Sequence, residues 1–207
     1  MIKKLYNKKS ENMLIENLEA ETFNRITCSF YNYINIKNPS GFRDKLYSLF
    51  HTLNIFGRIY VADEGINAQI SVPSHNWANF LKTISEMSEL SNVQIKKAIS
   101  EGISFYKLVV KVKKEIVAYG IPKNKYNMKI IGKHLSTEQF NSAINKEQTT
   151  IIDMRNIYES EVGKFKNAEI PQVEKSKDLL PEVRKMLKGR EHHQVLLYCT
   201  GGIRCEK

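Results

Sequence analysis

Residues 56–72 join two β-rich runs through a short polar turn, and this segment decides the fold of the first part of the chain. It reads Phe56-Gly57-Arg58-Ile59-Tyr60-Val61-Ala62-Asp63-Glu64-Gly65-Ile66-Asn67-Ala68-Gln69-Ile70-Ser71-Val72. Isoleucine, valine and tyrosine dominate both runs, which predicts strands at 59–62 and 68–72. The residues between them, 63–67, predict the connection. The elements that flank this pair of strands then determine the class of fold.

A strand and a helix are predicted on each side of the pair. Aromatic and β-branched residues at 26–34 predict the first strand, and an apolar run at 105–112 predicts the last. Apolar residues at helical spacing predict two helices, with Ser40 and Ser74 as their N-caps. The order β-α-β-β-α-β is that of a ferredoxin-like sandwich, which we therefore expect over residues 23–122.

The remaining residues divide into an arm, a linker and a second unit. Residues 1–22 are predicted to be a polar N-terminal arm with a short helix around 12–21, and residues 115–119 are predicted to be a further strand. Residues 123–134 are rich in lysine and predict a basic linker.

The second unit, residues 135–207, alternates predicted helices and strands. A helix capped by Ser136 or Thr137 comes first, and a strand at 149–153 follows it. A helix at 179–187 and a strand at 194–198 come next. This alternation predicts a parallel sheet, so the chain as a whole is expected to join an α+β unit to an α/β unit.

The last predicted strand runs directly into a cysteine loop, Cys199-Thr200-Gly201-Gly202-Ile203-Arg204. The carboxyl edge of a parallel sheet is where α/β proteins gather their sites. Two glycines let the loop N–H groups of Thr200, Gly201, Gly202 and Ile203 point at an anion. Together with Arg204, these donors should lower the pKa of the Cys199 thiol and favour the nucleophilic thiolate.

Blander interpretations of the same residues remain open. Cys199 could be a small apolar side chain at the end of a core strand. Arg204 could stabilise the thiolate, bind a phosphate, or fasten the loop through a salt bridge. We favour an inert position at the start of a helix for Cys205, although it could resolve an oxidised Cys199. Cys28 is expected in a strand core.

Charge points to a polyanionic partner. The net charge is +10, and between Val93 and His134 ten lysines face only two glutamates. Aromatic residues are interleaved with them, as in surfaces that bind RNA. Lys111, Lys113 and Lys123 are the candidate RNA-binding residues, and strand alternation puts Lys111 and Lys113 on one side of the strand. The alternative is a solvated, lysine-rich face.

Composition narrows the location and the cofactors. The sequence has no apolar stretch of the length that a membrane span needs, and its N-terminus lacks the pattern of a signal peptide. Three cysteines without framework spacing indicate a reducing compartment, so we expect a cytoplasmic protein without membrane attachment. No metal ligands have zinc spacing, and no cofactor is evident.

Two stretches carry a resemblance to a known family. The second unit resembles the rhodanese homology domain in Asp153-Met154-Arg155-Asn156 and the residues up to Ala168, and in Cys199–Arg204. The four residues between Cys199 and Arg204 match rhodanese loops, whereas phosphatase loops are one residue longer. Residues 56–72 and 198–207 resemble hallmark segments of the rhodanese-like tRNA uridine hydroxylases.

The resemblance implies a fold and an activity. The fold would be a ferredoxin-like sandwich followed by an incomplete rhodanese-like parallel α/β domain. The activity would be hydroxylation of the wobble uridine of tRNA to 5-hydroxyuridine, with molecular oxygen as co-substrate and tRNA as partner.

Cys199 would add covalently to C6 of uracil. Asp153 and Arg155 would form a structural pair that supports the site. Glu64 and Asn67 would face the substrate, although turn formation explains Asp63-Glu64-Gly65 nearly as well.

Family members continue beyond the position of Lys207, so the second unit is expected to be cut short, as a fragment or as a natural truncation. Two other functions stay open at this point. Cys199 could carry a persulfide in a sulfurtransferase, or the chain could bind RNA without catalysis.

Overall fold

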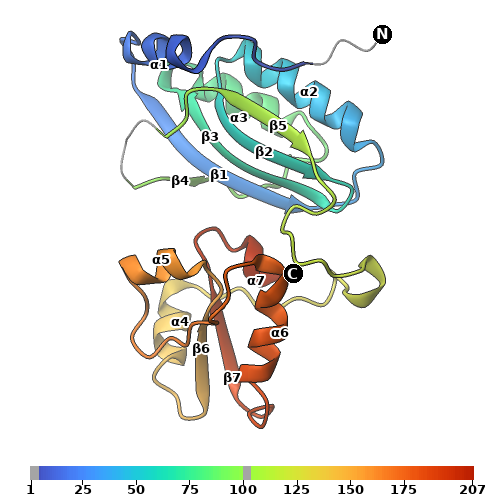
Figure 1. The fold of residues 1–207 in the computed structure, drawn as a ribbon, viewed down its shortest axis with the longest axis vertical. Helices are drawn as coiled ribbons and strands as arrows, with labels where there is room; N and C mark the ends of the chain where they lie inside the picture. Colours follow the sequence, from blue (N-terminus) through green and yellow to red (C-terminus); the bar gives the residue numbers. More distant parts are fainter. Residues whose placement is uncertain (1–4, 100–103) are drawn as a thin grey trace. The chain divides into compact units, whose positions relative to one another are not determined.

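The computed structural model describes residues 5–99 and 104–207 (Figure 1). The chain divides into two compact units, Met1–Ile116 and Val117–Lys207, and each contains its own sheet. In the part of the chain that the structure describes, none of the helices is both long and apolar enough to cross a membrane.

Unit 1 begins with the arm helix and then forms a sheet with two covering helices. Its elements, in chain order, are α1 (Glu11–Glu19), β1 (Arg25–Tyr33), α2 (Pro39–Thr52), β2 (Phe56–Ala62), β3 (Gly65–Pro73), the 3₁₀ turn η1 (Ser74–Asn76), α3 (Trp77–Ser85), β4 (Lys96–Lys97) and β5 (Leu108–Val112). The helix predicted in the arm is confirmed as α1, and both central strands are confirmed as β2 and β3.

The five strands form one mixed sheet in the order β4-β1-β3-β2-β5. β3 pairs antiparallel with both β1 and β2, and β4 pairs antiparallel with β1. The first four strands therefore have the arrangement of a ferredoxin-like sandwich, as the order of elements predicts. β5 extends this sheet by pairing parallel with β2.

The last predicted strand of unit 1 exists, but it lies at a different edge of the sheet from the one expected. The apolar run at 105–112 was expected to complete the four-stranded sheet, but only Leu108–Val112 is a strand, and it lies on the far edge beside β2. The edge beside β1 is instead filled by the two-residue strand β4. A strand of two lysines is too short to show the alternating pattern by which strands are predicted. The apolar run does predict a strand, but the sheet edge that this strand joins depends on packing.

One face of the sheet carries the core, and α2 and α3 cover it. The largest fully buried side chains include Phe50 from α2, Phe80 from α3 and Ile59, Ile66 and Ile70 from the strands. Burial in the strands alternates, as a sheet with one covered face requires. The two helices therefore fix which strand residues face the core.

Both predicted helix starts in unit 1 need correction. Asn38, not Ser40, caps α2, since its side chain accepts from the Gly41 N–H at 3.0 Å. Pro39 then takes the first helical position, where its missing N–H costs nothing. Ser74 opens the 3₁₀ turn η1, and α3 starts only at Trp77 without a side-chain cap.

A glycine fixes the start of β3. Gly65 has φ +148°, and a Cβ at this position would lie 2.0 Å from the carbonyl oxygen of Asn32 on β1. Only glycine allows the two strands to approach this closely. The turn between β2 and β3 is accordingly two residues, Asp63 and Glu64, and Asn67 lies within β3 and not in the connection as predicted.

Unit 2 has a two-stranded sheet with helices around it. Its elements are the 3₁₀ turn η2 (Lys123–Lys125), α4 (Thr137–Ala143), β6 (Thr149–Asp153), α5 (Ile157–Val162), α6 (Ser176–Met186), β7 (Gln194–Tyr198) and α7 (Ile203–Glu206). β6 and β7 pair in parallel, from Thr149 opposite Gln194 to Asp153 opposite Tyr198, so the predicted parallel sheet is confirmed.

Two further predictions in or near unit 2 are adjusted. Residues 115–119, all of them described, form no strand. The helix predicted at 179–187 begins earlier, at Ser176, and contains Pro181 in its middle. Ser136 caps α4 with a full capping box, which settles the choice between Ser136 and Thr137.

Candidate active site

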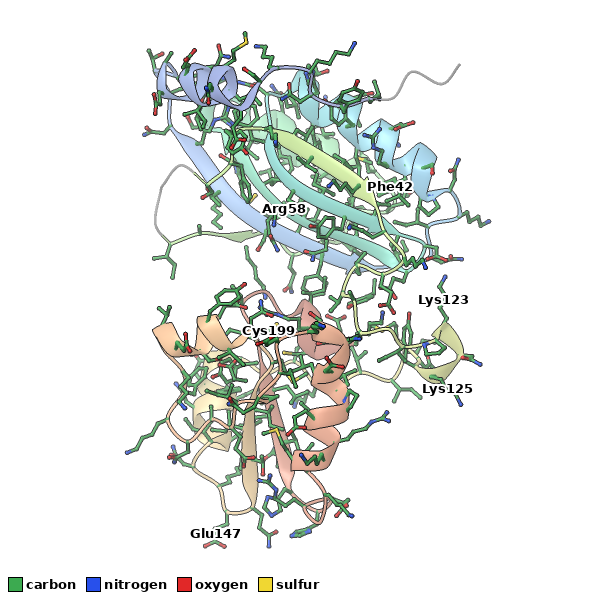
Figure 2. The ribbon with its side chains drawn as sticks, viewed as in Figure 1. Phe42, Arg58, Lys123, Lys125, Glu147 and Cys199 are labelled. Carbon is green, nitrogen blue, oxygen red and sulfur yellow. The ribbon has the colours of Figure 1, made fainter. Side chains whose placement is uncertain are left out.

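Cys199 is the first residue after β7, at the carboxyl end of the parallel pair (Figure 2). The chain turns sharply at Gly202, which has φ 93°, and enters the short helix α7 at Ile203. A side chain other than that of glycine would strain this left-handed position. The strand end and the glycine together place the partly buried thiol within hydrogen-bond reach of the Gly202 N–H.

Hydrogen bonds to the sulfur favour its ionised form. The Cys205 thiol is the strongest influence, and the backbone N–H groups of Arg204 and Gly202 add to it, with Gly202 N at 3.0 Å from Cys199 Sγ. The charge of Arg204 acts in the same direction. These contacts outweigh burial and lower the pKa of Cys199 to about 5. Cys199 is therefore a thiolate at neutral pH.

Cys205 is part of this site and not only a residue at a helix start. Its hydrogen bond to Cys199, together with burial, raises the pKa of the Cys205 thiol far above its usual range. Cys205 thus keeps its proton and offers it to the neighbouring sulfur. The sequence spacing alone does not reveal this role, because α7 must form before the two side chains meet.

Arg204 fastens the loop to α5. Its guanidinium donates to both carboxylate oxygens of Glu159, at 2.7 and 3.0 Å, and to Thr200 Oγ1 at 3.2 Å. Thr200 Oγ1 also donates to Glu159 Oε1 at 2.5 Å. Of the roles left open for Arg204, the geometry realises the salt bridge that fastens the loop, while its charge also favours the thiolate.

Glu159 is the functional residue that the sequence reasoning missed. Burial raises the pKa of its carboxyl, but hydrogen bonds from Arg204, Thr200 and the Asn156 N–H outweigh burial and bring the pKa down to about 2. The same carboxylate completes the capping box of α5 with Asn156. The spacing Asn156-x-x-Glu159 was the available signal, although it indicates only a helix start.

Asp153 organises a second network just below the loop. Its fully buried carboxylate accepts from Arg155 Nε at 2.9 Å and Nη2 at 2.7 Å, from Ser160 Oγ at 2.8 Å and from Tyr198 Oη at 2.7 Å. Burial raises the pKa of Asp153, but these bonds prevail and hold it at about 2. Asp153 and Arg155 are therefore paired, as the sequence predicts.

Tyr198 connects this network to the cysteine. Its hydroxyl donates to Asp153 and accepts from the Phe165 N–H at 3.4 Å, and its backbone leads directly into Cys199. On the other side of the loop, Tyr119 Oη donates to the Arg204 carbonyl at 2.6 Å. Hydrogen bonds therefore hold both the strand that precedes the thiol and the helix that follows it.

The other predicted residues lie outside this cluster. Glu64 lies in the β2–β3 turn, where its side chain accepts from the Ile116 N–H at 2.8 Å, and Asn67 lies on β3 between Tyr31 and Tyr60. Lys111 is on β5, and Lys113 follows it with its Nζ 5.3 Å from the Tyr60 ring centroid.

Lys123 is exposed in η2 and belongs to unit 2, whereas Lys111 and Lys113 belong to unit 1. The lysine-rich stripe of the sequence is therefore divided between the two units. Among residues 5–99 and 104–207, His, Cys, Asp and Glu side chains form no cluster of three or more that could hold a metal ion.

Comparison with known proteins first defines the class of domain. Residues 25–116 match the family described as the UPF0176 acylphosphatase-like domain, which covers the sheet and helices of unit 1 from β1 onward. This match agrees with the mixed α+β fold of unit 1.

Relatives that match nearly the whole chain share one name. Proteins called tRNA uridine(34) hydroxylase are 44% identical over 204 residues in Leptospira interrogans, 42% over 205 residues in Buchnera aphidicola and 41% over 206 residues in Escherichia coli. Each match covers 98% of this chain and, in the same order, 56%, 63% and 59% of the relative. The chain therefore spans somewhat more than half the length of these relatives. The predicted resemblance to tRNA uridine hydroxylases is confirmed.

Proposed function

We propose that this chain takes part in the hydroxylation of uridine 34 of tRNA to 5-hydroxyuridine, with Cys199 as the nucleophile. The observation that carries the proposal is the stabilised thiolate at the end of β7, in a chain homologous to proteins with that name. Unit 2 would be the rhodanese-like domain of such an enzyme. The tRNA would be its macromolecular partner, and the cytoplasm would be its location.

The thiolate suits an attack on an electron-poor ring carbon. Addition of Cys199 Sγ to C6 of uracil forms a C–S bond and moves the C5–C6 electron pair toward C5 and the O4 carbonyl. C5 then becomes electron-rich. One atom of molecular oxygen adds there, and the other leaves as water after taking two electrons and two protons from an external reductant. Loss of the C5 proton and expulsion of the thiolate restore the ring.

The residues around the Cys199 thiol have different roles in this reaction. Gly202 N–H and the Cys205 thiol keep the sulfur ionised before attack and can receive the returning negative charge afterwards. Glu159, Arg204 and Thr200 hold the loop in the geometry in which these donors converge. Asp153 and Arg155 position the strand end and do not touch the reacting atoms.

The experiment is complementation in a bacterial strain that lacks its own tRNA uridine hydroxylase. The wild-type chain should restore 5-hydroxyuridine in total tRNA, as measured by nucleoside mass spectrometry. Cys199→Ser should not, because a hydroxyl does not ionise at neutral pH. Cys28→Ala, which alters a cysteine in β1, should behave as wild type.

Equal modification by the wild-type chain and Cys199→Ser would contradict the nucleophile. No modification by the wild-type chain, despite normal expression, would contradict the activity for this polypeptide and favour RNA binding without catalysis.

Sulfur transfer is the second candidate, and the same thiolate favours it. A low pKa and the N–H groups of a glycine-rich loop also suit a thiol that accepts and holds a sulfane sulfur. Incubation with thiosulfate followed by mass spectrometry of the intact protein tests it. A gain of one sulfur on Cys199 that transfers to cyanide would support this function, and an unchanged mass would exclude it.

A further inference from the structure

The face of the unit 1 sheet that points away from the core carries two rows of polar and aromatic side chains. The first row crosses four neighbouring strands, with each residue opposite the next: Tyr31, Asn67, Tyr60 and Lys111. The second row crosses all five strands in the same way: Lys96, Ser29, Gln69, Arg58 and Val109.

The row of residues between these two shows which face of the sheet packs against the core. Phe30, Ala68, Ile59 and Val110 lie opposite one another, all at most 4% exposed, in the core beneath α2 and α3. Because successive strand residues point to opposite sides, the two polar rows lie on the other face. Lys97 confirms the assignment, since its Nζ lies 4.6 Å from the ring centroid of Trp77 in α3, whereas Lys96 points the other way.

The strands contribute positive charge to this face. None of the five strands contains an aspartate or a glutamate. Arg58, Gln69, Lys96 and Lys111 are exposed. Figure 2 labels Arg58 on β2. A strand face this basic would favour contact with an anionic partner.

Aromatic rings stand among these charges. Tyr31, Tyr33 and Tyr60 are half-buried, so that part of each ring is accessible. The rings of Tyr31 and Tyr33 lie edge to face, with centroids 6.1 Å apart, and the Lys113 ammonium lies 5.3 Å from the Tyr60 centroid. Tyr31 and Tyr60 are two strands apart, roughly 10 Å, which leaves separate positions for two planar groups.

We propose that this face binds unpaired nucleotides of an RNA. Bases would stack on Tyr31 and Tyr60, while Arg58, Lys96 and Lys111 contact the phosphates between and beside them. Asn67 and Gln69 supply amide donors and acceptors for base edges. A sheet that presents aromatic rings requires exposed base faces, so an unpaired segment fits and a continuous duplex does not. The proposal rests on the proposed function only in naming tRNA as the natural source of such a segment.

The first experiment separates stacking from charge. Binding of a fluorescent oligouridylate to the full chain carrying Cys199→Ser is measured by anisotropy, with an RNA duplex of equal length as the comparison. Replacing Tyr31 and Tyr60 together by alanine should weaken oligouridylate binding about tenfold or more. The same positions changed to phenylalanine should retain most of the affinity, because the rings remain. Tyr6→Ala, an exposed tyrosine of the arm, should change nothing.

The second experiment uses two adjacent lysines on opposite faces of β4. Lys96→Glu should weaken oligouridylate binding and reduce the slope of log affinity against log salt by about 0.7 per lost phosphate contact. Lys97→Glu changes the net charge equally, yet it should leave the salt slope as in the parent chain. Arg58→Glu should act like Lys96→Glu.

Three results would overturn the proposal. They are unchanged binding by the Tyr31 and Tyr60 double alanine variant, equal weakening by Lys96→Glu and Lys97→Glu, and tighter binding of the duplex than of the oligouridylate. Circular dichroism of each variant shows whether unit 1 is folded. If the alanine pair is not folded, the comparison of Lys96→Glu with Lys97→Glu still decides the proposal. Intact binding with no uridine modification would contradict the proposed function alone.

Discussion

Cys28 and Cys199 are the same chemical group in two regions of the molecule, and they differ in every property that matters for chemistry. Cys28 lies within β1, opposite Ile70 and 2% exposed, and burial raises the pKa of its thiol to about 12 despite the nearby charge of Lys97. Cys199 lies one residue beyond a strand, and hydrogen-bond donors lower its pKa to about 5. A cysteine inside a strand is an apolar side chain, and a cysteine after a strand can become a nucleophile.

The two environments differ in what their backbones can offer. Within a sheet, the N–H groups beside Cys28 are bonded to the neighbouring strands, so none turns toward the sulfur. In the loop, the left-handed Gly202 leaves its N–H free of the ladder and directs it at Cys199 Sγ. The end of the strand, more than the cysteine itself, creates the reactive thiol.

The largest expected effect is the difference in alkylation rate between these two thiols. At neutral pH, iodoacetamide should modify Cys199 several orders of magnitude faster than Cys28, because only a thiolate reacts. Against pH, the rate at Cys199 should reach half its maximum near pH 5, as followed by peptide mass spectrometry. Similar rates at the two cysteines, or a midpoint near pH 9, would remove the basis of the comparison.

Asp153→Asn should produce the largest loss of stability, about 3–5 kcal/mol for unit 2, because it leaves the Arg155 charge without its buried partner. Denaturant unfolding followed by a probe in unit 2 measures this loss. Since the folded pKa of Asp153 is depressed to about 2, its stabilisation is complete above the unfolded pKa near 3.8 and is lost as the pH falls through 2. The asparagine variant should lack this acid dependence, and identical acid profiles would refute the assignment.

Glu159→Gln should destabilise the loop by about 1.5–3 kcal/mol, since a charged partner is removed from Arg204 and Thr200. Hydrogen exchange at residues 199–206 should become faster. Glu161→Gln is the matched control, because Glu161 is an exposed carboxylate of the same helix. Equal effects of the two substitutions would show that the Glu159 contacts do not hold the loop.

Cys28→Ser should cost about 1–3 kcal/mol of unit 1 stability, since it buries a hydroxyl in the sheet core. Thermal unfolding of unit 1 measures the change, and the reactivity of Cys199 should stay the same. A changed rate of Cys199 alkylation in the serine variant would mean that the two regions are coupled. This result would contradict the comparison, which treats the two cysteines as independent.

The smallest expected effect is at Cys205. Cys205→Ala removes the thiol that donates to Cys199, and it should raise the pKa of Cys199 by one unit or more, each unit corresponding to about 1.4 kcal/mol. Cys205→Ser keeps a donor and should shift the alkylation midpoint less. If alanine and serine leave the midpoint unchanged, the backbone N–H groups alone account for the thiolate.

The sequence predicted much of this arrangement because short-range patterns carry it. Runs rich in β-branched and apolar residues predicted β2, β3, β6 and β7, and the strand followed at once by Cys-x-Gly-Gly-x-Arg indicated the cysteine whose pKa is lowered. The pairing of Asp153 with Arg155 also lies within two residues of sequence. These features depend on residues that are close together in the sequence, so local periodicity and turn-forming residues are enough to predict them.

Other features were decided only when distant segments met. β5 joined the edge beside β2, where Val110 could be buried, and a two-residue strand took the edge expected for it. Glu159 reached Arg204 across 45 residues of sequence, and Cys205 became the proton donor to Cys199. The rows of Tyr31, Tyr60 and Arg58 exist only through strand register. Local sequence patterns indicated where the strands end and which cysteine follows one of them. The tertiary structure supplied the groups that face this cysteine, because burial and hydrogen-bond partners are properties of packing between segments.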